Sequence, residues 1–306
     1  MVEEYDMKLN MMGLCFDTTS SNTGMTKGSL VRITEDVGHY LLLLACRHHV
    51  TELRMVHFWK SITNDTTSGP NNILFKKLKD TFENPSFKPN IDNLASFDWK
   101  AIRGTVIESA ALDSLNYCKV YLQRKDIIRD DRKELAELVV AYLSGQNSAL
   151  RKTGAIHHAR FIMKAIYYLK LARLAPQLEF VRDKPKLCQE IKAVAEFVSC
   201  FYAIWYLQAD NTIKAPYLDM NALQQMHKYK EVCDNMAAVD KVLTNMFKHV
   251  WYLDSTIIPL ALLDEAVPDE EKTNIAKAIM AIKMPHKDRF DYKSHDKPVK
   301  SLKDQL

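Results

Sequence analysis

Two short apolar runs near the start of the chain constrain its fold more than any other feature. They are Met11 to Phe16 and Tyr40 to Ala45, and each has the length and composition of a buried strand. Thr18 to Gly24 supplies turn residues after the first run, and Thr26 to Gly38 leaves room for a helix. With helical spacing over Val50 to Ile62, this part of the chain predicts the order strand, helix, strand, helix.

Polar side chains that could carry chemistry follow both apolar runs directly. Asp17 comes after the first run, and Cys46, Arg47, His48 and His49 come after the second. Ligands of α/β sheets bind beyond the carboxyl ends of the strands. We therefore expect Asp17 and this cluster to lie near each other and to form the candidate site.

These residues also have simpler interpretations, which the sequence leaves open. Asp17 precedes Thr, Ser and Asn residues, where a carboxylate often caps free backbone N–H groups. Cys46, His48 and His49 are zinc-ligand types, but a structural zinc site takes four ligands and no second Cys/His pair has suitable spacing. Otherwise Cys46 packs as a small apolar group, and His49 makes an orienting hydrogen bond at the strand end.

The chain beyond residue 105 has apolar side chains at the spacing of amphipathic helices. Gly145 stands where one helix would end, and Pro185 stands where another would begin. We predict a mainly α fold with a small α/β part. The predicted ranges are an α/β unit over 1–64, a connector over 65–104, a helical domain over 105–285 and a disordered, Lys-rich tail over 286–306.

The composition is compatible with a DNA partner without requiring one, because the net charge is +4 and the isoelectric point is about 8.6. Six dispersed cysteines and no secretory leader predict reduced thiols and a nuclear or cytoplasmic location. The longest apolar stretch, Ala193 to Leu207, contains Glu196 and is shorter than the roughly 20 residues that span a bilayer. We expect no membrane insertion and no small-molecule cofactor.

Several motifs in this order resemble one known family. The pattern FDTTSSNTG followed by LLLLACRHHVTEL is similar to the second catalytic Asp segment and the Cys-x-x-His segment of hAT-type transposases. The chain also looks like an uncharacterised group of invertebrate proteins derived from mobile elements. The similar stretches are RKELAELVVAYLSG (Arg132 to Gly145), GAIHHARFIMKAIYYLK (Gly154 to Lys170) and HVWYLDSTIIPLALLD (His249 to Asp264).

The resemblance implies an RNase H-like core with a helical insertion, and DNA strand transfer or hydrolysis by two Mg²⁺ or Mn²⁺ ions. Such ions lie roughly 4 Å apart between carboxylates, so Asp17 would be both a catalytic residue and a metal ligand. The family pattern also asks for an earlier Asp on another strand, and Asp6 is too near to supply it. No final Glu matches either, which leaves Glu265, Glu270 and Glu271 unassigned. We therefore expect a fragment or decayed copy that is catalytically incomplete.

The stretch from His157 to Arg173, which is rich in basic and aromatic residues, is the expected DNA contact. The resemblance aligns it with the Arg-Trp segment of hAT-type transposases, where an aromatic ring stacks on an unpaired base. In this chain the aromatic residue is Phe161, and the basic residues are Arg160, Lys164 and Arg173. The alternative is an amphipathic helix whose aromatic side chains lie in the core and whose cations are solvated.

Two hypotheses about function follow. The first is a transposon-derived protein related to DDE-type DNA transposases, catalytically incomplete, with residual DNA binding. The second is a non-catalytic helical scaffold that binds other proteins or itself as a homo-oligomer. If the first strands of the RNase H-like sheet are missing, the edge at Met11 to Phe16 should be exposed and prone to pair with another chain.

Overall fold

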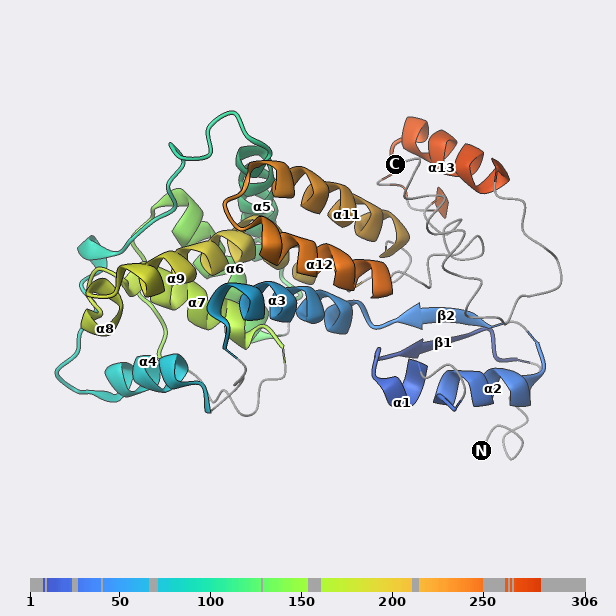
Figure 1. Ribbon diagram of the computed structural model, residues 1–306, viewed down its shortest axis with the longest axis horizontal. Helices are drawn as coiled ribbons and strands as arrows, with labels where there is room; N and C mark the ends of the chain where they lie inside the picture. The colour runs from blue at the N-terminus through green and yellow to red at the C-terminus, as the bar shows by residue number, and fades with distance from the viewer. Residues whose placement is uncertain are drawn as a thin grey trace. The chain divides into compact units, whose positions relative to one another are not determined.

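The computed structural model in Figure 1 describes residues 8, 10–23, 27–39, 41–65, 71–127, 129–153, 161–210, 215–249, 262, 263, 265 and 267–281. Within these residues the chain is mainly helical, with two short strands. The prediction of a mainly α fold with a small α/β part is confirmed. The chain forms two compact units: the first unit is Met1–Val50, Ala209–Gln224 and Thr244–Leu306, and the second unit is Thr51–Gln208 and Gln225–Leu243.

The first unit contains the predicted α/β arrangement. The strands β1 (Gly13–Phe16) and β2 (Leu42–Ala45) pair in parallel along their whole length. The connection between them contains α1 (Ser20–Thr23) and α2 (Ser29–Val37), as a parallel pair requires a crossover rather than a tight hairpin. This order of elements brings the carboxyl ends of both strands to the same edge.

Two glycines make this arrangement possible. A Cβ atom at Gly13 would lie 2.8 Å from the carbonyl oxygen of Leu42, so a side chain there would push the strands apart. Gly38 ends α2 in the left-handed conformation, with φ 77°, and its N–H donates to the Thr34 carbonyl at 3.0 Å. Gly38 therefore ends α2 a few residues before β2 begins.

The prediction that β1 is buried is only partly correct. Phe16 is buried, whereas Cys15 is exposed and the Met12 side chain just before the strand is 77% exposed. The described part of the sheet has two strands, so one side of β1 lacks a neighbouring strand among these residues. Pairing of this edge with another chain stays a prediction.

Three of the described helices contribute residues to both units, and a fourth lies in the first unit. The helix α3 (Arg47–Thr63) starts after β2 and the single residue Cys46, and its residues from Thr51 onward belong to the second unit. The others are α11 (Ala215–Val232), α12 (Met236–His249) and, in the first unit, α13 (Asp269–Ala281).

The second unit is a helical assembly. Its elements are α4 (Ile73–Glu83), the 3₁₀ turn η2 (Ile91–Asn93), α5 (Val106–Leu122), α6 (Asp130–Ser144), α7 (Met163–Leu174), α8 (Glu179–Arg182), α9 (Pro185–Phe197), the π-helical segment η4 (Val198–Tyr202) and α10 (Ala203–Leu207). Gly145 ends α6 with φ 70°, and Pro185 starts α9, as the sequence predicts. Figure 1 shows α7 beside α6 and α9.

Aromatic side chains fill the core of the second unit. Phe58 of α3 stacks on Phe197 of α9 with ring centroids 4.1 Å apart. Trp59 donates its indole N–H to the hydroxyl of Tyr168 at 2.8 Å, and Phe75 packs on Tyr167 at 4.8 Å. Both tyrosines belong to α7, so the aromatic residues in this part of the predicted DNA-contact stretch lie in the core.

The division between the two compact units falls within α3, and residues 209–224 return to the first unit. The predicted ranges of the domains stay a prediction. Most of the predicted linker after Thr63 and the whole tail over 286–306 lie outside the described residues. In the described chain we found no helix with both the length and the apolar character needed to cross a membrane.

Candidate functional site

The candidate site lies where both strands end, in the first unit. Phe16 is opposite Ala45, and the Cys46 N–H donates to the Phe16 carbonyl at 2.6 Å. Asp17 and the Cys46-Arg47-His48-His49 cluster therefore follow neighbouring strand ends, as the order of the elements predicts. Hydrogen bonds from Thr19 are the main cause of the lowered pKa of the Asp17 carboxyl, and the proximity of His49 adds a smaller contribution.

Asp17 is held chiefly by its own turn. Its Oδ1 accepts hydrogen bonds from the Thr19 backbone N–H at 3.1 Å, the Thr19 hydroxyl at 2.6 Å and the Asn22 amide at 2.8 Å. These hydrogen bonds stabilise the carboxylate and hold its pKa below the ordinary value, with the Thr19 hydroxyl contributing most. The arrangement is a side-chain-stabilised turn, which agrees with the simpler interpretation of Asp17.

The described side chains do not fit the two-metal site that the resemblance implies. Across the ranges described above, no group of three or more His, Cys, Asp or Glu side chains is placed to hold a metal ion. Glu265 and Glu270 are exposed, whereas Asp6 and the side chain of Glu271 lie outside what is described. A metal-ligand role for Asp17, and a zinc role for the neighbouring cluster, receive no support from this geometry.

Replacing Asp17 with Ala is expected to lower the free energy of unfolding by about 1 kcal/mol at pH 7, the usual cost of losing a capping side chain. The lowered pKa means that the carboxylate stabilises the fold above its unfolded pKa, near 3.8, and that this contribution disappears as the pH falls through the folded pKa. Urea titrations of the wild type, Asp17→Ala and the control Asp17→Asn would measure it. Asn keeps one acceptor oxygen, so an equal loss in both variants would contradict the role of the turn.

The cluster after β2 has mainly structural contacts. Arg47 is buried and forms an ion pair with the buried carboxylate of Asp219 at the start of α11. His48 is 3.6 Å from a carboxylate oxygen of Asp210, and Cys46 is half-buried. Sequence patterns alone indicate no separate role for Arg47, since its partner is 172 residues away in the chain.

The described residues of the predicted DNA contact, Phe161, Lys164 and Arg173, do not form one exposed basic face. Arg160 lies outside the described residues, and Phe161 is half-buried just before α7. The Lys164 ammonium is 3.4 Å from the carboxylate of Glu52, with its side chain 14% exposed. Arg173 is fully buried, a placement that does not suit the predicted contact with DNA.

The guanidinium of Arg173 is instead bound inside the second unit. It donates to the carbonyls of Ala95 at 3.3 Å, Ala141 at 2.8 Å and Gln146 at 2.7 Å. These carbonyls belong to three separate parts of the chain, the connector before α5, α6 and the segment after α6. Arg173 therefore ties these segments together around α7.

Glu52 is a buried carboxylate that the sequence analysis missed. It accepts hydrogen bonds from the Tyr202 hydroxyl at 2.8 Å and the Ile162 N–H at 3.2 Å, besides its contact with Lys164. Burial raises its pKa, and these three partners oppose that rise. Helical spacing could have indicated that Glu52 is buried. It lies three and seven residues before the buried Met55 and Trp59, and residues at this spacing share one face of a helix.

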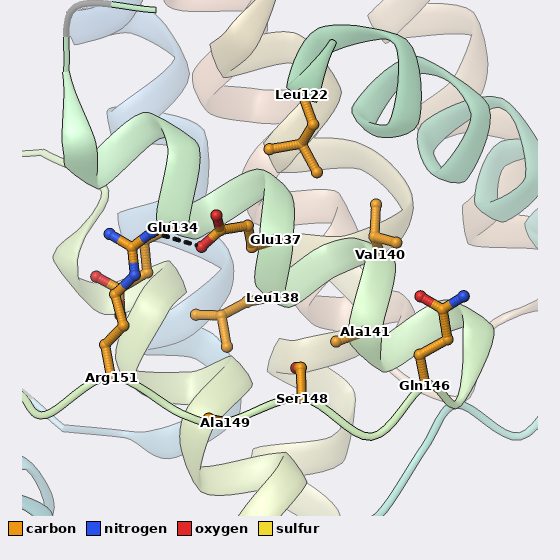
Figure 2. A pocket seen from close by; sticks show the side chains of 10 residues that line it. All are labelled: Leu122, Glu134, Glu137, Leu138, Val140, Ala141, Gln146, Ser148, Ala149 and Arg151. Carbon is orange, nitrogen blue, oxygen red and sulfur yellow. Dashed lines mark hydrogen bonds and ion pairs between the residues drawn. The ribbon is translucent and has the colours of Figure 1, made fainter.

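The second unit also contains a pocket of about 340 Å³ (Figure 2). Leu138 and Ala141 of α6 and Ala149 of the following extended segment supply apolar lining. The Arg151 guanidinium donates to Glu137 at 2.8 Å, as the dashed line in Figure 2 marks. Because this charge is paired with a lining carboxylate, the pocket gives no clear preference for an anionic or cationic ligand.

Comparisons with protein-family models, curated proteins and solved structures give no match for this chain. Its function must therefore be argued from its own residues. The strand-end site and the start of α7 are the two places where motifs from the sequence and features of the structure coincide.

Proposed function

We propose that the chain is a transposon-derived protein related to DDE-type DNA transposases, with an RNase H-like unit that binds DNA but does not assemble the catalytic metal site. The observation that carries this proposal is the parallel β1–β2 pair, with the Asp17 turn after one strand and the Cys-x-x-His segment after the other. A second, mainly helical unit follows, which is the layout that the resemblance implies.

The absence of catalysis is proposed from the state of Asp17. Its Oδ1 already accepts three hydrogen bonds, and no metal-holding cluster occurs among the residues that the structure describes. DNA binding is proposed from the basic net charge and from Phe161, whose ring could stack on an unpaired base. Arg173 plays no part in this proposal, because its guanidinium is used inside the fold.

The test is binding of the purified chain to a branched DNA with unpaired bases and to a plain duplex of equal length. Fluorescence anisotropy at several salt concentrations should show affinity that falls as salt rises, because phosphate contacts release counterions. Phe161→Ala should bind the branched DNA about tenfold more weakly, the effect of losing one stacked base. Phe87→Ala is the matched control, since Phe87 is another half-buried aromatic residue of the second unit.

Three results would contradict different parts of this proposal. Absence of binding even at low salt would remove the DNA partner. Strand cleavage that requires Mg²⁺ or Mn²⁺ and is lost in Asp17→Ala would show that the catalytic site is assembled after all. Equal affinities of the Phe161→Ala and Phe87→Ala variants would remove Phe161 from the DNA contact.

A second candidate function is a non-catalytic scaffold that associates with itself. The internal use of Lys164 and Arg173 favours it, because two of the expected DNA-facing cations contribute to the fold instead. Light scattering over a range of protein concentrations tests it directly. A mass that rises with concentration, together with absence of DNA binding, would favour the scaffold over the DNA-binding protein.

A further inference from the structure

The backbone just before α7 has an unusual conformation. Ile162 has φ 70° and ψ −30°, a region that β-branched residues rarely adopt. Its side chain is fully buried. A strained conformation of this kind persists only where the surrounding structure holds it, and such positions cluster at functional sites.

Glu52 supplies the contacts that hold this turn. Its Oε2 accepts the Ile162 N–H and the Tyr202 hydroxyl, and its Oε1 faces the ammonium of Lys164. The N–H groups at the start of a helix have no partner within the helix, and a side chain close in sequence usually satisfies one of them. Here the acceptor comes from α3, 110 residues earlier in the chain.

The contacts of Glu52 lie next to Phe161, the aromatic residue of the predicted DNA contact. Phe161 directly precedes Ile162, and Lys164 lies in the first turn of α7. One buried carboxylate thus contacts the backbone and a side chain on the carboxyl side of Phe161. Tyr202 approaches the same carboxylate from η4, so the turn is fixed between two other elements of the second unit.

We infer that Glu52 is a positioning residue, which fixes the backbone of the Phe161–Lys164 turn and thereby the direction in which Phe161 is presented to DNA. This inference rests on the proposed DNA binding for its functional part. Its structural part, the hold of Glu52 on Ile162, can be measured without DNA.

The test compares Glu52→Ala and Glu52→Gln with Glu196→Ala. Glu196 is the matched control, because it also accepts a hydrogen bond from a tyrosine hydroxyl within the second unit, that of Tyr229 at 3.0 Å. In Glu52→Ala, amide hydrogen exchange at Ile162 should become at least about tenfold faster, after correction for global stability, because a hydrogen bond to a charged acceptor is lost. DNA affinity should fall by about the same factor as in Phe161→Ala, about tenfold.

The other variants separate positioning from a general structural role. Glu52→Gln keeps one acceptor oxygen and should recover part of both losses. Lys164→Met removes the ammonium but leaves the N–H acceptor, so exchange at Ile162 should stay as in the wild type. Glu196→Ala should lose stability while leaving Ile162 exchange and DNA affinity unchanged.

The outcomes distinguish this inference from the proposed function. A wild type that does not bind DNA would refute the proposed function and the functional part of the inference, while fast Ile162 exchange in the Glu52 variants would still support the structural part. Unchanged Ile162 exchange in Glu52→Ala would overturn the inference whatever the DNA result. If Glu52→Ala does not fold, Glu52→Met replaces it, because Met also lacks an acceptor oxygen while filling similar space, and unchanged Ile162 exchange in that variant would overturn the inference in the same way.

Discussion

Replacing Arg173 with Leu is expected to lower the free energy of unfolding of the second unit by about 4 kcal/mol. Leu is an apolar residue that can occupy part of the space, but it cannot donate to the carbonyls of Ala95, Ala141 and Gln146. The hydrogen bond to Ala141 is buried and the other two are partly buried. An unpaired buried carbonyl costs about 1–3 kcal/mol and each of the other two bonds contributes about 1 kcal/mol, so the loss should be among the largest for one substitution. Chemical unfolding followed by circular dichroism would measure it.

Arg173→Lys is the informative control for this prediction. Lysine keeps the charge but cannot spread donors over three carbonyls as a planar guanidinium does, so most of the stability should still be lost. If Arg173 contacted DNA, Arg173→Lys would instead keep both stability and most of the affinity. Full stability of Arg173→Leu would show that the guanidinium does not hold these segments together.

The second large effect is expected at the buried ion pair of the first unit. Replacing Asp219 with Leu should cost about 3–5 kcal/mol, because it leaves the buried guanidinium of Arg47 without its carboxylate. The loss should appear in the transition of the first unit. Hydrogen exchange of the β2 amides would report it, since Arg47 lies two residues after the end of that strand and begins α3.

A double variant tests whether this cost comes from the unpaired charge. Arg47→Met combined with Asp219→Leu should recover most of the stability, as apolar side chains often replace a buried ion pair with little net loss. The exposed pair of Arg182 and Asp183 is the matched control, and Asp183→Ala should leave the unfolding midpoint unchanged. A double variant no more stable than Asp219→Leu would mean that the pair specifies the packing of α11 in some other way.

The local features of the fold could be predicted from the sequence. The two apolar runs, with a turn and a helix-length segment between them, predicted β1, α2 and β2. Each predicted strand began two residues before the strand in the structure and ended at the same residue. Gly145 and Pro185 marked the ends of helices because their backbone preferences act within a few residues. The shared edge of Asp17 and the Cys46-to-His49 cluster followed from the same order of elements.

The roles of the charged side chains could not be predicted in this way. Helical spacing shows which face of a helix is buried, but it does not show which groups meet that face. Glu52 and Arg173 look like ordinary polar positions until partners from distant segments surround them. The sequence therefore suggested solvated or DNA-facing cations where the structure has internal hydrogen bonds.

The sequence by itself determined the helices, the order of the two strands and the turn at Asp17, because these depend on backbone preferences and on contacts between near neighbours. Only the tertiary structure decided that the described residues place no metal-holding group around Asp17. It also decided that Arg173 is internal and that Glu52 reaches Ile162. The physical reason is that burying a charge requires a partner, and the partner is supplied by whichever distant segment packs there.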